Sequence, residues 1–219
     1  MRKSARDFGI GAVCVCGLTI GGLFGYQQIF TQGLDRLPDR VCDGAVDRET
    51  VAHVLPDARS ASEDGGATGT GDNFLVGCRV DTTGDSLVSG EVKVQDVSAK
   101  SWSDFYKGYG GSEEGKALHV ATNEVRALSK TRIASVYVPC VPRGVKASNA
   151  RQSYALIGEV RVVGESRVKG AVLRQELTDF AYQLTQHAYK TAECQKDLGF
   201  PEELPGYPPS LTASEPLSP

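Results

Sequence analysis

The stretch FLVGCRVDTTGDSLVSGEVKVQDV, residues 74–97, contains two strand-like runs on either side of a short polar turn. The runs are residues 74–81 and 87–97, and residues 82–85 between them have the Thr, Gly and Asp composition of a hairpin turn. Alternate side chains of a strand point to opposite faces. In the first run the apolar face contains Phe74, Val76, Cys78 and Val80. The stretch therefore predicts a β-hairpin with one face in a core.

More strands are predicted on the C-terminal side of this hairpin. Residues 133–140 and 154–163 have firm strand patterns, and residues 117–121 and 125–128 have weaker ones. Alternation within the first of these places four side chains on one face: Ala134, Val136, Val138 and Cys140. Together with the hairpin, these runs predict a sheet of several strands.

Three helices are predicted around these strands. Asp47 is suited to cap a helix that ends near Pro56, and Ser101 is suited to cap a short helix that ends near Tyr109. A long helix is predicted over about residues 169–197. Its apolar stripe follows a 3,4 spacing: Leu173, Leu177, Phe180, Leu184, His187, Thr191 and Cys194. This order of elements predicts an α+β fold, with a mostly antiparallel sheet and helices on one face.

Two segments are predicted to lie outside regular structure. Residues 60–72 are rich in Gly, Ser, Thr and acidic side chains, which predicts a flexible loop, and they lack the Gly-Lys-Ser/Thr ending of a phosphate-binding loop. Residues 199–219 contain six prolines, which predicts a disordered tail. The folded domain is therefore expected to span residues 42–198.

Four cysteines fall within this domain, namely Cys42, Cys78, Cys140 and Cys194. An even number of cysteines in an oxidising compartment indicates two disulfides, and four cysteines allow three pairings. Cys78 and Cys140 are on inward strand faces, which favours the pairs Cys42–Cys78 and Cys140–Cys194. A metal site is the rival interpretation. The sequence disfavours it, because it has no C-x-x-C and no paired histidine spacing.

An apolar run at residues 8–30 follows the basic residues Arg2, Lys3 and Arg6. About 20 apolar residues are enough to cross a bilayer, and basic residues favour the cytoplasmic side. The run therefore predicts an uncleaved signal anchor with residues 1–7 in the cytoplasm, residues 31–41 as a tether and the domain outside the cell. A cleaved export signal and a lipid anchor at Cys14 or Cys16 are the alternatives.

Three glycines within this run recur every fourth residue: Gly17, Gly21 and Gly25. Small residues at this spacing let two membrane helices approach closely. The spacing predicts a homodimer or a membrane protein partner, although glycine is common in membrane helices.

Charge is distributed unevenly along the chain. Residues 31–125 carry 9 basic and 17 acidic side chains, whereas residues 126–198 carry 12 basic and 6 acidic ones. No acidic residue lies between Glu124 and Glu159, where six basic residues occur: Arg126, Lys130, Arg132, Arg143, Lys146 and Arg151. These could face anionic lipid or wall polymer, or the two halves of the chain could neutralise each other. An extracytoplasmic location disfavours nucleic acid as a partner.

No catalytic motif is present in the sequence. His53, His119 and His187 are the only histidines, and none belongs to a motif that supplies a nucleophile and an orienting group. The Gly-x-Ser-x-Gly elbow of esterases is missing. The sequence therefore predicts no cofactor and disfavours an enzyme.

The cysteine framework resembles that of exported proteins from Streptomyces and related actinobacteria. The resemblance rests on an N-terminal anchor and on short motifs around the cysteines: Cys42-Asp43-Gly44, Val76-Gly77-Cys78, Val138-Pro139-Cys140 and Ala192-Glu193-Cys194. It covers roughly residues 1–198 and implies a cell-envelope location, but no activity.

These observations favour a membrane-anchored extracytoplasmic module that binds a ligand or forms a complex. The alternative is a cell-envelope hydrolase with an unrecognised site. A hydrolase would need a cleft where a histidine or two carboxylates converge with a nucleophile, whereas a binding module needs only an exposed apolar or charged patch.

Overall fold

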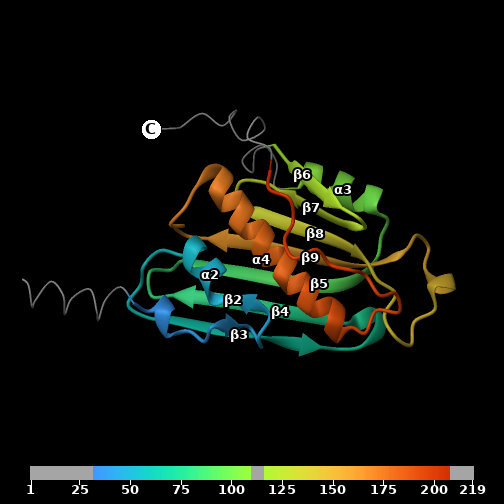
Figure 1. Cartoon of the computed structure of the whole chain (residues 1–219), viewed down its shortest axis with the longest axis horizontal. Coiled ribbons are helices and arrows are strands. Elements are labelled where there is room, and N and C mark those ends of the chain that lie inside the picture. Colours follow the sequence, from blue (N-terminus) through green and yellow to red (C-terminus); the bar gives the residue numbers. More distant parts are fainter. Residues whose placement is uncertain (1–31, 110–115, 208–219) are drawn as a thin grey trace, which may run out of the picture.

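The computed structural model describes residues 32–109 and 116–207 and contains a seven-stranded antiparallel sheet (Figure 1). The strand order is β3-β4-β5-β9-β8-β7-β6, and each neighbouring pair is antiparallel. The strands are β3 (Ala61–Thr68), β4 (Leu75–Thr82), β5 (Leu87–Asp96), β6 (Leu118–Thr122), β7 (Val125–Ser129), β8 (Ile133–Pro139) and β9 (Tyr154–Val163). The predicted mostly antiparallel sheet is confirmed.

The predicted hairpin at residues 74–97 forms β4 and β5. Its register places Val76 opposite Val92 and Val80 opposite Val88, so valines from both strands share the buried face. The next strand across the sheet is β9, in its centre, with the bounds expected from the sequence. β4 and β5 each bury one set of alternate side chains, as period-2 patterning requires, whereas the first half of β9 is buried on both faces.

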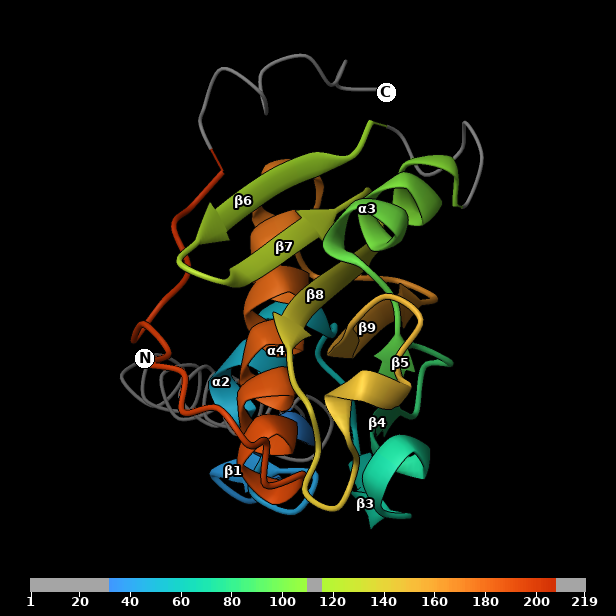
Figure 2. The same ribbon diagram turned by 90° about the vertical axis from the view of Figure 1, so that its right-hand side faces the viewer.

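Helices pack on both faces of the sheet, so the prediction of helices on one face was wrong. The long helix α4 (Gly170–Thr191) crosses one face, with α2 (Arg48–Val54) beside it. The short helix α3 (Ala99–Gly108) packs on the opposite face, and Figure 2 shows α3 and α4 on opposite sides of the strands. Because both layers cover β8, six of its seven residues are buried.

The side of the sheet that α3 occupies follows from alternation in β8 and β9. Val136 and Leu156 point into the core beneath α4, whereas their neighbours Tyr137 and Ile157 point the other way and contact Trp102 of α3. Large apolar side chains on the second face require a second layer.

The helix α4 ends at Thr191, six residues before the predicted end. Leu173, Leu177, Phe180 and Leu184 are buried as expected, but His187 is half-buried and Thr191 is exposed. A strict 3.5-residue spacing drifts by about 20° per heptad on a helix with 3.6 residues per turn. This drift turns the predicted stripe away from the core at His187 and Thr191. Cys194 lies beyond the end of the helix, after Glu193, whose φ is 49°. The cap of α3 also differs from the prediction, because Ser98 and not Ser101 accepts the capping hydrogen bond.

Both predicted disulfides are present. Cys42–Cys78 joins the turn between the short strands β1 (Arg40–Val41) and β2 (Val46–Asp47) to β4. Cys140–Cys194 joins the residue after β8 to the turn after α4. Each bridge therefore ties a strand of the sheet to a segment from a different part of the chain.

Residues 60–72, predicted as a flexible loop, instead contain β3 and the short helix η2 (Gly71–Asn73). All eight residues of β3 pair with β4. A Cβ atom on Gly65 would lie 2.7 Å from the Cβ of Cys42, so glycine permits the close approach of β3 to the disulfide. The small and acidic residues that resemble a loop in sequence are those of a polar edge strand.

The predicted tether and part of the predicted tail also belong to the fold. Within residues 32–41, Leu34 of η1 (Leu34–Arg36) and Val41 are buried. Residues 199–207 run along α4 (Figure 1), where Leu204 and Tyr207 are buried and the Tyr207 hydroxyl lies 2.9 Å from that of Thr178. Tyrosine and leucine anchor this segment despite its prolines.

Within residues 32–109 and 116–207, no helix combines the length and the apolar character needed to cross a membrane. The predicted anchor at residues 8–30, its three glycines and residues 1–7 lie outside the described residues, as do residues 208–219 of the predicted tail.

Candidate functional site

The face of the sheet that carries α3 is covered only in part. Trp102 and Tyr106 of α3 pack over β8 and β9. The helix does not extend over β5 and β4, where the outward-facing side chains Arg79, Glu91 and Lys93 are exposed. We call this uncovered part the open face. It includes these outward-facing residues of β3, β4, β5 and β9: Asp64, Gly66, Leu75, Gly77, Arg79, Ser89, Glu91, Lys93, Glu159 and Arg161, and it is bordered by the buried Ile157.

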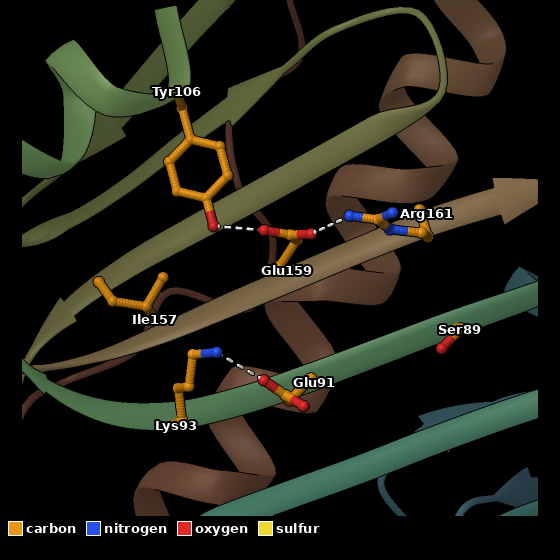
Figure 3. Close-up of a pocket in the computed structure, with 7 residues that line it drawn as sticks. All are labelled: Ser89, Glu91, Lys93, Tyr106, Ile157, Glu159 and Arg161. Atoms are coloured by element: carbon orange, nitrogen blue, oxygen red, sulfur yellow. Dashed lines mark hydrogen bonds and ion pairs between the residues drawn. The ribbon is translucent and has the colours of Figure 1, made fainter. Parts of the chain in front are cut away.

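A pocket of about 250 Å³ lies where the open face meets α3 (Figure 3). Two central strands and one helix line it. The lining residues are Ser89, Glu91 and Lys93 from β5, Ile157, Glu159 and Arg161 from β9, and Tyr106 from α3. Four of these seven side chains are charged.

Two carboxylates face each other across the pocket floor. The register of β5 and β9 places Glu91 directly opposite Glu159, which sets their Cβ atoms about 5 Å apart. Like charges in this position repel. Each is therefore neutralised by a cation two residues away on its own strand. Lys93 Nζ lies 2.8 Å from Glu91 Oε1, and Arg161 Nη2 lies 2.6 Å from Glu159 Oε1.

Glu159 is held from both sides. In Figure 3 it lies between Tyr106 and Arg161, and the Tyr106 hydroxyl donates to its Oε2 at 2.6 Å. Burial, together with the nearby Glu159 carboxylate, raises the pKa of Tyr106. Tyr106 therefore stays protonated and remains a donor. Arg161 also donates to the Tyr109 hydroxyl at 2.7 Å, so the cation is fixed as well.

Buried contacts beneath α3 position Tyr106. The Trp102 indole N–H donates to the Ser135 hydroxyl of β8 at 2.9 Å. The Trp102 ring packs against Tyr106 at 6.0 Å and against Tyr137 at 5.6 Å between centroids. The wall that α3 contributes to the pocket is therefore fixed to the sheet by both apolar and polar contacts.

The structure does not gather the six predicted basic residues on one surface. Lys130 is buried and donates to the backbone carbonyl of Tyr109. Arg132 donates to the backbone carbonyls of Val162 and Gly164. Arg126 of β7 lines a separate hollow with Trp102. Lys130 and Arg132, two of the three basic residues that precede β8, thus stabilise the fold by bonding backbone carbonyls.

The other three basic residues follow β8, at its far end. Arg143, Lys146 and Arg151 lie in the connection between β8 and β9, and Arg143 forms an ion pair with Glu193 at 2.6 Å. The seven residues of β8 span roughly 20 Å. Lys130 and Arg132 precede the first residue of β8, so they are separated by the length of this strand from the three basic residues that follow it. Arg126 pairs with Tyr137, near the end of β8 from which the connection to β9 begins.

The three histidines lie on different elements. His53 of α2 has its Nδ1 3.1 Å from Glu176 Oε1 of α4. His119 lies on β6, where desolvation, followed by the charge of Lys107, lowers its pKa. His187 lies on α4. None lines the pocket of Figure 3. Across residues 32–109 and 116–207, no group of three or more His, Cys, Asp or Glu side chains could hold a metal ion.

A second, wider groove of about 670 Å³ lies between α2, α4 and the C-terminal segment. Six acidic side chains line it, namely Asp47, Glu49, Glu176, Asp179, Glu202 and Glu203. Burial raises the pKa of Asp179 to about 6, with further contributions from the charges of Glu176 and Glu203, while a hydrogen bond from Gln175 acts in the opposite direction.

Replacing Asp179 with asparagine is expected to stabilise the protein at pH 7 but not at pH 4. The pKa in the folded state is above the ordinary 3.8, so ionisation costs the folded state stability as pH rises from about 4 to 6, and the cost persists at higher pH. The difference in urea unfolding midpoint between variant and parent, measured at both values, tests this. Glu165→Gln removes an exposed carboxylate and serves as the control. An equal difference at both pH values would contradict the assignment.

The residues of the pocket were missed in the sequence. Alternation within residues 87–97 and 154–163 does place Glu91 and Glu159 on outward faces. Their juxtaposition depends on the pairing of β5 with β9, which brings together two residues 68 positions apart in the chain, and alternation does not specify this pairing. The only signal available was a pair of i, i+2 opposite charges in each strand, Glu91 with Lys93 and Glu159 with Arg161.

Comparison of the chain with protein-family models, with curated proteins and with solved structures gives no match.

Proposed function

We propose that the chain is a membrane-anchored extracytoplasmic binding module and that the open face is its binding surface. The observation that carries this proposal is the ordered pocket beside α3. A solvent-facing sheet surface is common in antiparallel folds. A surface on which a carboxylate, a guanidinium and two tyrosine hydroxyls are fixed by mutual hydrogen bonds is preorganised for a ligand.

The anchor at residues 8–30 and the two disulfides support the proposed location. Disulfides persist in oxidising compartments. The anchor would hold the domain at the membrane surface, and its glycine face would supply contact with a second copy or with a membrane protein. An envelope ligand is within reach of such a domain.

A cell-envelope hydrolase is the second candidate. One observation favours it, namely the two carboxylates that face each other at Glu91 and Glu159. Glycosidases use a pair of carboxyl side chains that flank the scissile bond. In this pocket, however, each carboxylate is bound to a cation of its own strand, which favours a binding role.

Labelled cell-wall fragments are expected to bind intact protoplasts that carry the full chain. Such fragments do not cross the membrane, so binding requires the domain to be outside. Glu91→Gln should weaken binding because it removes one carboxylate of the pocket. The matched control is Glu124→Gln, which removes an exposed glutamate paired with Lys196 outside the pocket.

Three outcomes of this assay would contradict the proposal. Binding only to inverted membrane vesicles would show that the domain faces the cytoplasm. Equal binding by the parent and by Glu91→Gln would exclude the open face as the binding surface. Release of soluble fragments that stops in both Glu91→Gln and Glu159→Gln would establish the hydrolase instead.

A further inference from the structure

A row of four residues runs across the strands of the open face, and we call this row the trough. Gly66 of β3, Gly77 of β4, Glu91 of β5 and Glu159 of β9 are aligned in register. At Gly66 and Gly77 nothing lies within 4 Å of the position a Cβ atom would take. Neighbouring strands are about 4.8 Å apart, so the row spans roughly 14 Å. This length suits a short oligomer better than a single small molecule.

Side chains flank this row of residues on both sides. The row on one side contains Arg79, Ser89 and Arg161, and the row on the other contains Leu75, Lys93 and Ile157. Gly66 and Gly77 carry no side chains, so the half of the trough on β3 and β4 is lower than its borders. The other half holds Glu91 and Glu159, which line the pocket of Figure 3.

Aromatic rings border the pocket end of the trough. Phe105 of α3 is 58 % exposed. Its ring lies 5.0 Å from Tyr106 and 5.4 Å from Tyr109 between centroids. Tyr106 and Tyr109 in turn bond Glu159 and Arg161. The exposed ring thus contacts Tyr106, which lines the pocket, and offers an apolar surface beside it.

The charges of the pocket balance. Glu91 and Glu159 are matched by Lys93 and Arg161, each pair at 2.6–2.8 Å. The two carboxylates would repel a strongly anionic ligand, and the ammonium and guanidinium groups would repel a strongly cationic one. A neutral ligand with many hydroxyl groups can donate to the carboxylates and accept from the cations while both ion pairs persist.

We propose that the trough binds a neutral saccharide chain, with its hydroxyl groups on the four charged side chains and an apolar sugar face against Phe105. This rests on the proposed function and specifies the ligand of the same surface. Balanced charge, paired donors and acceptors, an exposed aromatic ring and a row of residues that crosses four strands are the features that match this class.

Gly77→Val is the variant that tests the trough. The new side chain would enter open space and would fill the trough at this position, and valine is favoured in strands. The fold should therefore tolerate it. Gly84→Val is the matched control, because Gly84 lies in the turn between β4 and β5 and also has nothing within 4 Å of a new Cβ.

The full chain in detergent is titrated with three probes of related size, namely an N-acetylglucosamine tetramer, its cationic glucosamine counterpart and an anionic hexuronic acid tetramer. The neutral tetramer is expected to bind most tightly, and Gly77→Val is expected to weaken its binding at least about tenfold. Raising the salt from about 50 to about 500 mM should change its affinity less than about twofold, because no net charge is neutralised. Phe105→Ala should weaken binding severalfold, and Gly84→Val should leave it unchanged.

Other outcomes would overturn the saccharide assignment. Tighter binding of a charged probe, lost in Gly77→Val, would mean that the open face binds ligand but that the ligand class is wrong. Binding of the neutral tetramer that Gly77→Val leaves unchanged would place the saccharide elsewhere. Absence of binding by the neutral tetramer, with wall-fragment binding by protoplasts retained, would reject this proposal and leave the proposed function in place.

Discussion

Replacing both Cys140 and Cys194 with serine is expected to lower the free energy of unfolding by about 4 kcal/mol. The bridge closes a loop of 54 residues, and its Cα atoms are 5.3 Å apart, within the usual range for a disulfide. Loss of the bridge restores conformational freedom to the unfolded chain. It also frees the turn after α4, which leads into the segment that packs along that helix.

Trp102 provides a direct readout of this change. It is the only tryptophan of the chain, and its side chain is buried between α3 and the sheet, so its fluorescence reports global unfolding. The full chain in detergent is unfolded with urea with and without a reductant. Substituting Cys14 and Cys16 with serine removes two cysteines but neither bridge, and this control should match the parent. A loss below about 1 kcal/mol in the Cys140/Cys194 variant would contradict the prediction.

Gly158→Ala is expected to lower the free energy of unfolding by about 1–3 kcal/mol, because it overpacks the contact between the central strand and α4. A Cβ atom on Gly158 would lie 2.2 Å from Thr185 Oγ1. Thr185 is fully buried, and its hydroxyl donates to the Ala181 carbonyl at 2.7 Å, so it is not free to move away. The helix can approach β9 this closely only because residue 158 has no side chain.

A double-mutant cycle isolates this contact. Thr185→Ala removes the atom that the new methyl group would meet, so the loss in the Gly158→Ala/Thr185→Ala variant should be smaller than the sum of the two single losses by about 1 kcal/mol or more. Gly77→Ala is the control, because its Cβ would enter open space. Its stability should equal or slightly exceed that of the parent, since glycine in a strand costs conformational entropy. Additive losses in the cycle would assign the effect of Gly158→Ala to another cause.

Local patterning was sufficient to predict much of the sheet. The hairpin of β4 and β5 was predicted because alternation and a turn signal coincide within 24 residues, and β9 was predicted to its end residues for a similar reason. The disulfide pairs followed from which strand faces carry Cys78 and Cys140. These are properties of single strands, which alternation reports well.

Features that depend on pairing between distant strands were missed or misplaced. The predicted position of α3 was wrong. Tyr137 and Ile157 require a second layer of structure, and this requirement becomes evident only when β8 and β9 are placed side by side. The strand β3 was missed because it gains its structure from β4 and from the Cys42–Cys78 bridge, and its own residues have weak strand propensity. The pocket was missed because the register of β5 and β9 creates it.

The unequal covering of the sheet has a consequence for protein engineering. Substitutions on either face of β8 would disturb packed side chains, whereas the outward positions of β4 and β5 contribute little to the core. A library randomised at Arg79, Ser89, Glu91 and Lys93 would therefore retain the fold in most of its members. The open strands can thus accept new surface chemistry, in evolution or in laboratory selection, almost independently of the residues that maintain stability.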